Sequence, residues 1–302
     1  MDGPQFVIEA NEVESMVKKT GLSVLQLLAS LVDTTKSLAR PPISKFHVGA
    51  VGLGSDGRIF RGVNLEFPGL PLHQSVHAEQ FLICNAFLNG EPHIQYIAVS
   101  APPCGHCRQF LQEIRGATDI KILITSFDNG EIERLDSAYR PISDFLPHRF
   151  GPDDLLEKSV PLLLEPRDNG LILSDSDKVR NGTIMSNGSV ASDHEKLKYR
   201  AIEAANRSHA PYSKCPSGIS LMDSDGKVYK GSYMESAAYN PSLGPTQAAL
   251  IAYITRGGES YEKIVAAALV EKEGVMVRQE AVARLLLTTV SPSCEFSLFH
   301  CK

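Results

Sequence analysis

The sequence lacks features that mark several common classes of protein. Lys and Arg number 30 against 35 Asp and Glu, so the net charge is -5 and there is no basic excess to bind a phosphate backbone. The longest apolar runs, such as "IVAAALV" at 264–270, are too short to span a bilayer. The first residues contain neither a basic nor an apolar region, which predicts no secretory signal. We therefore expect a small-molecule substrate, with no nucleic-acid or membrane partner.

Cysteine is also scarce. Six cysteines in 302 residues, two of them in one CxxC, do not make a disulfide framework. This is typical of a reducing compartment, so we expect the protein in the cytosol. A content of 43% hydrophobic and 22% charged residues is that of a soluble globular protein, and the length favours two cores.

The first half of the chain alternates predicted helices with predicted strands. Leucines at helical spacing predict a helix over 23–40, stopped by two prolines, and residues 46–66 predict a hairpin around a Ser-Asp-Gly turn. Helix, strand, helix and strand are then predicted in turn at 77–88, 94–102, 107–114 and 120–127. This alternation predicts a layered α/β domain that ends near Phe150.

An internal repeat indicates how the chain is organised. Residues 42–66 align without gaps, at an offset of 169, with residues 211–235, and Pro, Ser, Lys, the Ser-Asp-Gly turn, two glycines and the final Glu coincide. A predicted helix precedes each segment. We interpret the chain as two copies of one domain. The expected boundaries are 1–156 for the first copy with its N-terminal helices, 157–190 for a turn-rich linker, and 191–302 for the second copy.

Four residues of the first copy carry the predicted chemistry. "HAEQ" places His77 and Glu79 two residues apart, and "PCGHC" supplies Cys104 and Cys107. One imidazole and two thiolates suit Zn²⁺ and leave a fourth position open for water. Glu79 follows a ligand closely enough to reach that water, where a general base belongs, because zinc lowers the pKa of the water towards 7.

The second copy lacks these residues. Continuing the same offset pairs His77 with Thr246 and Glu79 with Ala248, and no CxxC follows. We therefore expect one zinc per chain and a second copy that keeps the scaffold without the chemistry.

The combination of HxE with PCxxC is the signature of zinc deaminases, which attack C4 of cytosine or C6 of adenine. "HAEQ", "PCGHCRQF", "NLEF" and "LPHRFGPDDL" together resemble cytidine deaminase, and the duplicated layout resembles its long-chain homodimeric form of bacteria and plants. The resemblance covers nearly the whole chain. It implies a three-layer α/β/α fold, duplicated, with a degenerate second copy, assembled as a homodimer.

The resemblance also implies an activity and a set of site residues. The activity is zinc-dependent hydrolysis of cytidine and deoxycytidine to uridine and deoxyuridine plus ammonia, in pyrimidine salvage. His77, Cys104 and Cys107 are the implied metal ligands, and Glu79 is the implied catalytic residue.

Five further residues are implied in binding the nucleoside. Asn64 and Glu66 would hold the ribose hydroxyl, and Phe46 would line the pyrimidine pocket. Phe150 would stack on the pyrimidine from the neighbouring subunit. Ala78, beside the catalytic Glu, completes the set.

Several alternatives remain open from the residues alone. A CxxC by itself also fits a redox pair or a structural zinc site. Other substrates would be a polynucleotide or a nucleotide monophosphate, but the carboxylate of Glu66 near the sugar would repel a phosphate. A zinc scaffold that only binds nucleosides is a third alternative, against which the intact Glu79 argues. In the second copy Glu235 keeps the position of Glu66, but Tyr233 replaces Asn64, so a structural role is favoured for Glu235.

Overall fold

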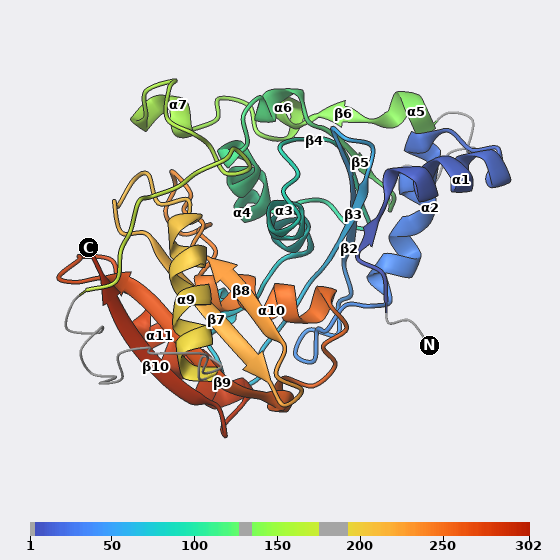
Figure 1. Cartoon of the computed structure of the whole chain (residues 1–302). Coiled ribbons are helices and arrows are strands. Elements are labelled where there is room, and N and C mark those ends of the chain that lie inside the picture. The colour runs from blue at the N-terminus through green and yellow to red at the C-terminus, as the bar shows by residue number, and fades with distance from the viewer. Residues whose placement is uncertain (1–3, 127–134, 175–192) are drawn as a thin grey trace. The chain divides into compact units, whose positions relative to one another are not determined.

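The computed structural model describes residues 4–126, 135–174 and 193–302 (Figure 1). These residues form two compact units, each with its own sheet. The first comprises Met1–Glu165 together with Ser236–Ser242, and the second comprises Pro166–Glu235 and Leu243–Lys302. Residues 175–190 of the predicted linker lie outside the described residues.

The first unit begins with elements that precede the repeat. Strand β1 (Val7–Ile8) was not predicted. Helix α1 (Ala10–Thr20) lies in the region where N-terminal helices were expected without stated bounds, and α2 (Val24–Lys36) confirms the helix expected at 23–40. Ser23 begins α2 with a capping box: its hydroxyl accepts from the Gln26 N–H, and the Gln26 side chain accepts from the Ser23 N–H. Two unpaired donors at the helix start are satisfied in this way.

The sheet of the first unit has six strands in the order β1-β3-β2-β4-β5-β6. The predicted hairpin is confirmed as the antiparallel pair β2 and β3, and β4 runs parallel to β5. The strand bounds are Gly49–Gly54 for β2, Ile59–Val63 for β3, Ile94–Val99 for β4, Lys121–Ile124 for β5 and Arg140–Pro141 for β6.

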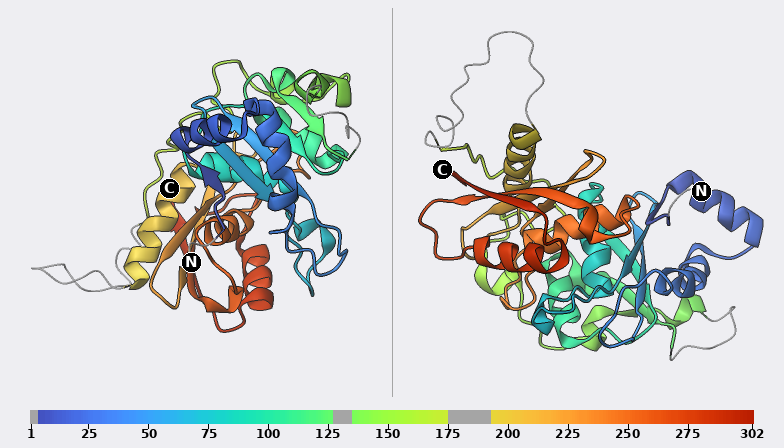
Figure 2. Two further views of the ribbon diagram at one scale, coloured as in Figure 1. Left: turned by 90° about the vertical axis from the view of Figure 1, so that its right-hand side faces the viewer. Right: turned by 90° about the horizontal axis from the view of Figure 1, so that it is seen from below.

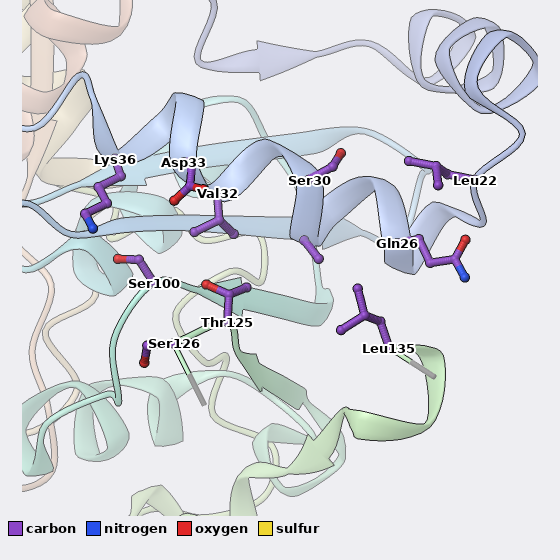
Figure 3. Close-up of a pocket in the computed structure, with 11 residues that line it drawn as sticks. Leu22, Gln26, Ser30, Val32, Asp33, Lys36, Ser100, Thr125, Ser126 and Leu135 are labelled. Carbon is purple, nitrogen blue, oxygen red and sulfur yellow. The ribbon is translucent and has the colours of Figure 1, made fainter. Parts of the chain in front are cut away.

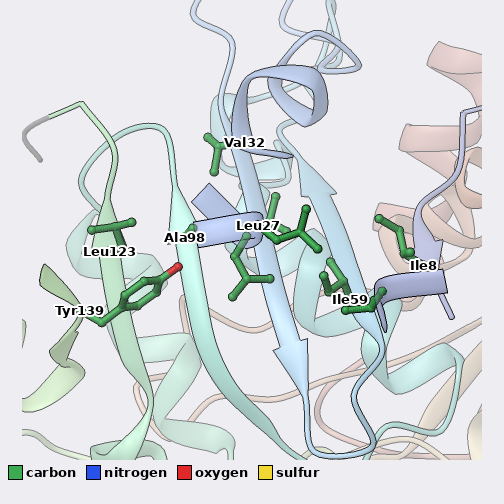
Figure 4. Packing of buried hydrophobic residues seen from close by; sticks show 10 residues of the cluster. Ile8, Leu27, Val32, Ile59, Ala98, Leu123 and Tyr139 are labelled. Carbon is green, nitrogen blue, oxygen red and sulfur yellow. The ribbon is translucent and has the colours of Figure 1, made fainter. Parts of the chain in front are cut away.

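Helices cover both faces of this sheet, as predicted for three layers (Figures 1 and 2). On one face α2 packs against the strands through a buried apolar cluster (Figure 4) that includes Leu27, Leu28, Val32, Val51, Ile59, Ala98 and Leu123. On the other face lies α3 (Ala78–Leu88), which is buried along ten of its eleven residues. Helix α4 (Gly105–Phe110) contacts α3.

The remaining segments of the first unit are short. The helix predicted at 107–114 begins at Gly105 and continues as the 3-10 turn η2 (Leu111–Glu113). The other short helices are η1 (Leu72–Gln74), η3 (Ala117–Asp119), α5 (Leu135–Ala138), α6 (Ile142–Phe145) and α7 (Pro152–Leu155).

The second unit repeats the central connectivity. Its sheet has the order β10-β9-β7-β8, in which β7 is antiparallel to both β8 and β9, and β9 is parallel to β10. Strands β7, β8, β9 and β10 thus correspond to β2, β3, β4 and β5 of the first unit. The elements are α9 (Asp193–Asn206), β7 (Ser217–Asp223), β8 (Val228–Ser232), α10 (Pro245–Thr255), η5 (Tyr261–Lys263), β9 (Ile264–Lys272), α11 (Glu280–Val290) and β10 (Glu295–Cys301). The predicted duplication of one α/β domain is confirmed.

One repeated glycine has the same function in both sheets. A Cβ at Gly62 would lie 2.3 Å from the carbonyl oxygen of Ala78, and one at Gly231 would lie 2.1 Å from that of Pro245. Only glycine lets the backbone of the helix approach the strand so closely. Each glycine therefore seats the first turn of a helix on its sheet, and in the first unit this turn carries the predicted catalytic Glu. Among the described residues, no helix combines the length and apolar composition needed to cross a membrane.

Candidate active site

The three predicted metal ligands come together at the starts of two helices. His77 is the residue before α3, Cys104 is the residue before α4, and Cys107 lies in the first turn of α4. Nδ1 of His77 lies 3.4 Å from Sγ of Cys104 and 3.3 Å from Sγ of Cys107, and the two sulfurs are 3.8 Å apart. One compact set of three donors results.

These separations fit one tetrahedral zinc ion. With Zn–S near 2.3 Å and Zn–N near 2.0–2.1 Å, tetrahedral geometry requires about 3.8 Å between the sulfurs and about 3.5 Å from nitrogen to sulfur. The sulfur–sulfur spacing matches this geometry, and the two nitrogen–sulfur spacings are about 0.1–0.2 Å shorter than it requires. Zinc held by His77, Cys104 and Cys107 would keep a fourth position for water.

The electrostatics of the cluster stabilise one thiolate. The hydrogen bond with Cys107, followed by that with His77, lowers the pKa of Cys104 to about 3. The same hydrogen bond with Cys104 raises the pKa of His77. A thiolate is thus present at neutral pH, and thiolates are the form of cysteine that binds metal.

Glu79 lies beside the ligand set without belonging to it. It is in the first turn of α3, only 4% of its surface is exposed, and its Oε2 is 3.3 Å from Sγ of Cys107. Burial raises the pKa of the Glu79 carboxyl. A raised pKa makes the carboxylate a stronger base, which favours removal of a proton from water.

A cavity of about 470 Å³ opens onto this cluster. Its wall includes Phe46, Asn64, Glu66, His77, Ala78, Glu79 and Cys104, which are seven of the nine residues predicted for the site. Its volume lies within the range of small-molecule pockets. The two others are Cys107, which is buried behind the wall, and Phe150, which is 45% exposed and does not line this cavity.

Asn64 and Glu66 organise the rim of the cavity. Asn64 accepts from the Val48 N–H (2.8 Å) and donates to the Phe46 carbonyl (2.9 Å). Glu66 accepts from the N–H groups of Ile43 and Ser44 and from the Ser44 hydroxyl. Both side chains therefore hold residues 43–48 in place around Phe46, which is 61% exposed.

A second cavity lies on the other face of the first sheet (Figure 3). It has a volume of about 400 Å³ and is lined by α2 residues such as Ser30, Asp33 and Lys36, with Ser100 and Thr125 opposite. None of its described lining residues is a His or a Cys, so its donor set is unlike that of the zinc cluster.

Comparison with known proteins agrees with the geometry. The family model for the cytidine and deoxycytidylate deaminase zinc-binding region matches residues 23–123, and a second family model of the same description matches residues 142–284. The chain is 61% identical to cytidine deaminase 1 of Arabidopsis thaliana, over 100% of this chain and 99% of that protein. It is 35% identical to the cytidine deaminase of Serratia proteamaculans, over 96% of this chain and 89% of that protein.

The chain belongs to the cytidine and deoxycytidylate deaminase family. Both copies match it, so the duplication inferred from the repeat is a duplication of the family's own domain. Among the described residues, the set formed by His77, Cys104 and Cys107 is the one cluster of His, Cys, Asp or Glu with the spacing of a metal site.

The predicted pairing of catalytic positions between the copies was wrong by two residues. The offset of 169 holds through the hairpin, where Leu65 and Met234 occupy equivalent bridges, but their bridge partners Val76 and Leu243 differ by 167. The loop of the second copy is two residues shorter. His77 therefore corresponds to Gly244, the residue before α10, and Glu79 corresponds to Thr246 instead of Ala248. The conclusion that the second copy lacks the ligand and the acid stands.

Three residues near the site were not predicted. Ser44 binds Glu66, and its counterpart Ser213 in the aligned repeat was a signal that could have revealed it. Gln80 and Glu113 are buried polar side chains next to the two ligand-bearing helices. No pattern in the sequence pointed to them, because their partners lie 161 and 124 residues away.

Proposed function

We propose that this protein catalyses the zinc-dependent hydrolytic deamination of cytidine and deoxycytidine, giving uridine and deoxyuridine plus ammonia, in pyrimidine salvage. Family membership gives the reaction class. The observation that carries the proposal is the position of Glu79, buried beside the three metal ligands and in the wall of the same cavity. A site with the metal ligands alone would serve a structural zinc as well.

Each group of the site has a part in the reaction. Zinc, when bound, lowers the pKa of a coordinated water. Glu79 takes one proton from the attacking water and delivers it to N3 of the pyrimidine. It then takes the second proton from the hydroxyl now on C4 and gives it to the amine, which departs as ammonia when the C4–N4 bond breaks. Atoms balance as nucleoside plus water giving the deaminated nucleoside plus ammonia. Because Glu79 is buried, its proton passes to the substrate and not to bulk solvent.

The cavity wall supports a nucleoside over a phosphorylated substrate. Asn64 and Glu66 lie together in it, and we assign them to the ribose hydroxyl. Hydrogen bonds from Ser44 and Ile43 outweigh the effect of burial and lower the pKa of Glu66, so this group is an anion at neutral pH. An anion near the sugar repels a 5'-phosphate. Ala78, also in the wall, and Phe46 are assigned to the pyrimidine.

We further propose that the protein acts as a homodimer in the cytosol. Ile43, Phe46 and Leu72 line the cavity with exposed fractions of 46%, 61% and 71%, which suits an apolar partner surface. Phe150, exposed and outside the cavity of its own chain, would stack on the pyrimidine of the partner's site. None of the six cysteines is in a disulfide, as in proteins of reducing compartments.

An ultraviolet assay of the purified protein tests the reaction. We expect loss of cytidine absorbance with cytidine and deoxycytidine, and much slower loss with deoxycytidine monophosphate. A preference for the monophosphate would replace the nucleoside assignment. Binding of cytidine without turnover by the zinc-loaded protein would support the alternative of an inactive nucleoside-binding scaffold.

A further inference from the structure

A short segment of the second copy belongs to the unit that holds the active site. Residues 236–242, here called the 236–242 loop, lie between β8 and α10 in the chain but are grouped with Met1–Glu165 in one compact unit. The N–H of Tyr239 donates to the Ser236 carbonyl, and that of Ser242 donates to the Tyr239 carbonyl, both at 2.9 Å. These bonds give the loop a closed turn of defined shape.

One contact of the 236–242 loop reaches the catalytic helix. Gln80, adjacent to Glu79 in the first turn of α3, is 1% exposed and donates through Nε2 to the Pro241 carbonyl at 2.9 Å. The other end of the same amide accepts from the backbone N–H of His77 at 3.4 Å. The Gln80 side chain therefore connects the 236–242 loop to the backbone of a metal ligand.

A second contact reaches the helix that carries the cysteines. Glu113 ends the η2 turn that continues α4, and its side chain is fully buried. Its Oε1 accepts from the Ala237 N–H at 2.7 Å. The main-chain carbonyl of Glu113 accepts from the Leu163 N–H at 2.9 Å, which fixes this turn on its other side.

We infer that the 236–242 loop positions the two arms of the zinc site relative to each other. One arm is α3 with His77 and Glu79, and the other is α4 with the two cysteines. Gln80 and Glu113 are the positioning residues, since each joins one arm to the loop through a buried hydrogen bond. The effect on turnover rests on the proposed function, whereas the effect on the metal does not.

The expected change in zinc release and in kcat follows from the known effect of hydrogen bonds that orient metal ligands. Loss of an outer hydrogen bond that orients a ligand typically costs about 10- to 100-fold in metal affinity or activity. Displacement of a catalytic group by 1 Å costs roughly 10²-fold in rate. The non-catalytic copy thereby takes part in catalysis, because it supplies the 236–242 loop.

The test compares two buried glutamines at equivalent helix positions. Gln80→Met removes the donor to Pro241 at similar volume, and the control Gln247→Met makes the same change in the first turn of α10. Zinc release from each holoenzyme is followed with excess 4-(2-pyridylazo)resorcinol, below the midpoint of thermal unfolding. We expect release about 10-fold faster for Gln80→Met, with kcat lowered about 10-fold and KM for cytidine little changed. Gln247→Met should release zinc and turn over like the wild type.

A second pair of variants tests the other arm. Glu113→Gln keeps an oxygen that accepts from Ala237, so it should retain most of kcat and the slow zinc release. Glu113→Leu leaves the Ala237 N–H buried without an acceptor, so both readouts should change as for Gln80→Met. If Gln80→Met does not fold, this pair decides the question.

Two results would overturn the inference. One is wild-type zinc release and kcat in both Gln80→Met and Glu113→Leu. The other is an equal loss in Gln247→Met, which would mean general destabilisation. If the wild-type holoenzyme does not deaminate cytidine, the proposed function fails, but the zinc-release comparison still decides the role of the loop.

Discussion

The two copies share the contacts that build the scaffold and differ where the chemistry lies. Glu66 and Glu235 each accept two backbone N–H groups and one serine hydroxyl, from Ile43 and Ser44 in the first copy and from Tyr212 and Ser213 in the second. Lys45 and Lys214, next in each chain segment, both have positive φ, 61° and 58°. This network persists in a copy that lacks the zinc ligands, so it supports the scaffold in both copies.

The difference lies in the first turn of one helix. The second copy begins α10 with Gly244 and Pro245, residues favoured at those positions for conformational reasons. The first copy has His77 and Ala78 there, followed by a buried Glu79. Burying a carboxyl costs stability. The first copy therefore buries a carboxyl where the second copy has residues that favour a helix start, and the residues that differ are those of the proposed reaction.

Removal of a metal ligand should have the largest effect. Cys104→Ala should lose zinc and activity together, because His77 and Cys107 alone cannot hold the ion as three donors do. The control Cys215→Ala removes a buried cysteine of the second copy and should keep both. Metal analysis of the wild type should give one zinc per chain. Two tightly bound zinc ions would mean that the second copy has a metal site after all.

Removal of the acid should preserve the metal but not the turnover. Glu79→Ala should lower kcat by about 10²- to 10⁴-fold, the usual cost of losing a general acid and base, with zinc content unchanged. Thr246→Ala, at the corresponding position of α10, should leave kcat as it is. Wild-type turnover by Glu79→Ala would contradict the mechanism.

Loss of the stacking ring should have an intermediate effect. Phe150→Ala should lower activity roughly 5- to 150-fold and keep zinc, because stacking of a base on an aromatic ring contributes about 1–3 kcal/mol. Refolding these chains together with Glu79→Ala chains tests action in trans. A mixed dimer then has one site that combines intact Glu79 with intact Phe150, so activity should exceed the sum of the two parents. No increase is possible if Phe150 serves its own chain.

The ribose assignment predicts a smaller change in binding. Asn64→Ala removes a neutral hydrogen bond to the sugar, worth about 0.5–1.5 kcal/mol, so KM for cytidine should rise about 2- to 12-fold with zinc retained. Glu66→Gln should raise KM as well and relax the bias against a 5'-phosphate. Glu235→Gln disturbs the same network in the second copy and should leave KM unchanged. An unchanged KM in both first-copy variants would refute the assignment.

The smallest expected effect is on stability as a function of pH. Because the pKa of Glu66 is lowered below its ordinary 4.5, its carboxylate stabilises the folded state at higher pH, and this contribution is lost as the pH falls through the lowered value. Glu66→Gln should therefore have a slightly lower Tm than the wild type at neutral pH. The difference should shrink below about pH 4.5. A difference that grows on acidification would have the wrong sign.

The local elements and the ligand set could be predicted because each is encoded in nearby residues. The apolar spacing from Val24 and the capping residue Ser23 specify α2, and HAE with PCxxC specifies the metal chemistry. Strand β1 was not predicted because a strand of two residues carries no periodic pattern. The start of α4 at Gly105 was missed because the Cys-Gly-His segment before the predicted start carries no such pattern either. The shift in pairing at α10 escaped because ungapped alignment cannot detect a shorter loop.

The sequence by itself determined the donor types, the acid and the duplication, since these are properties of residue identity and short spacing. The tertiary structure decided that Asn64 and Glu66 bind the rim segment, that Phe150 lies outside its own cavity, and that the 236–242 loop joins the catalytic unit. Gln80 and Glu113 meet partners more than a hundred residues away. Such contacts arise only when packing brings distant backbone groups together, because a buried polar group must then find a partner wherever the fold provides one.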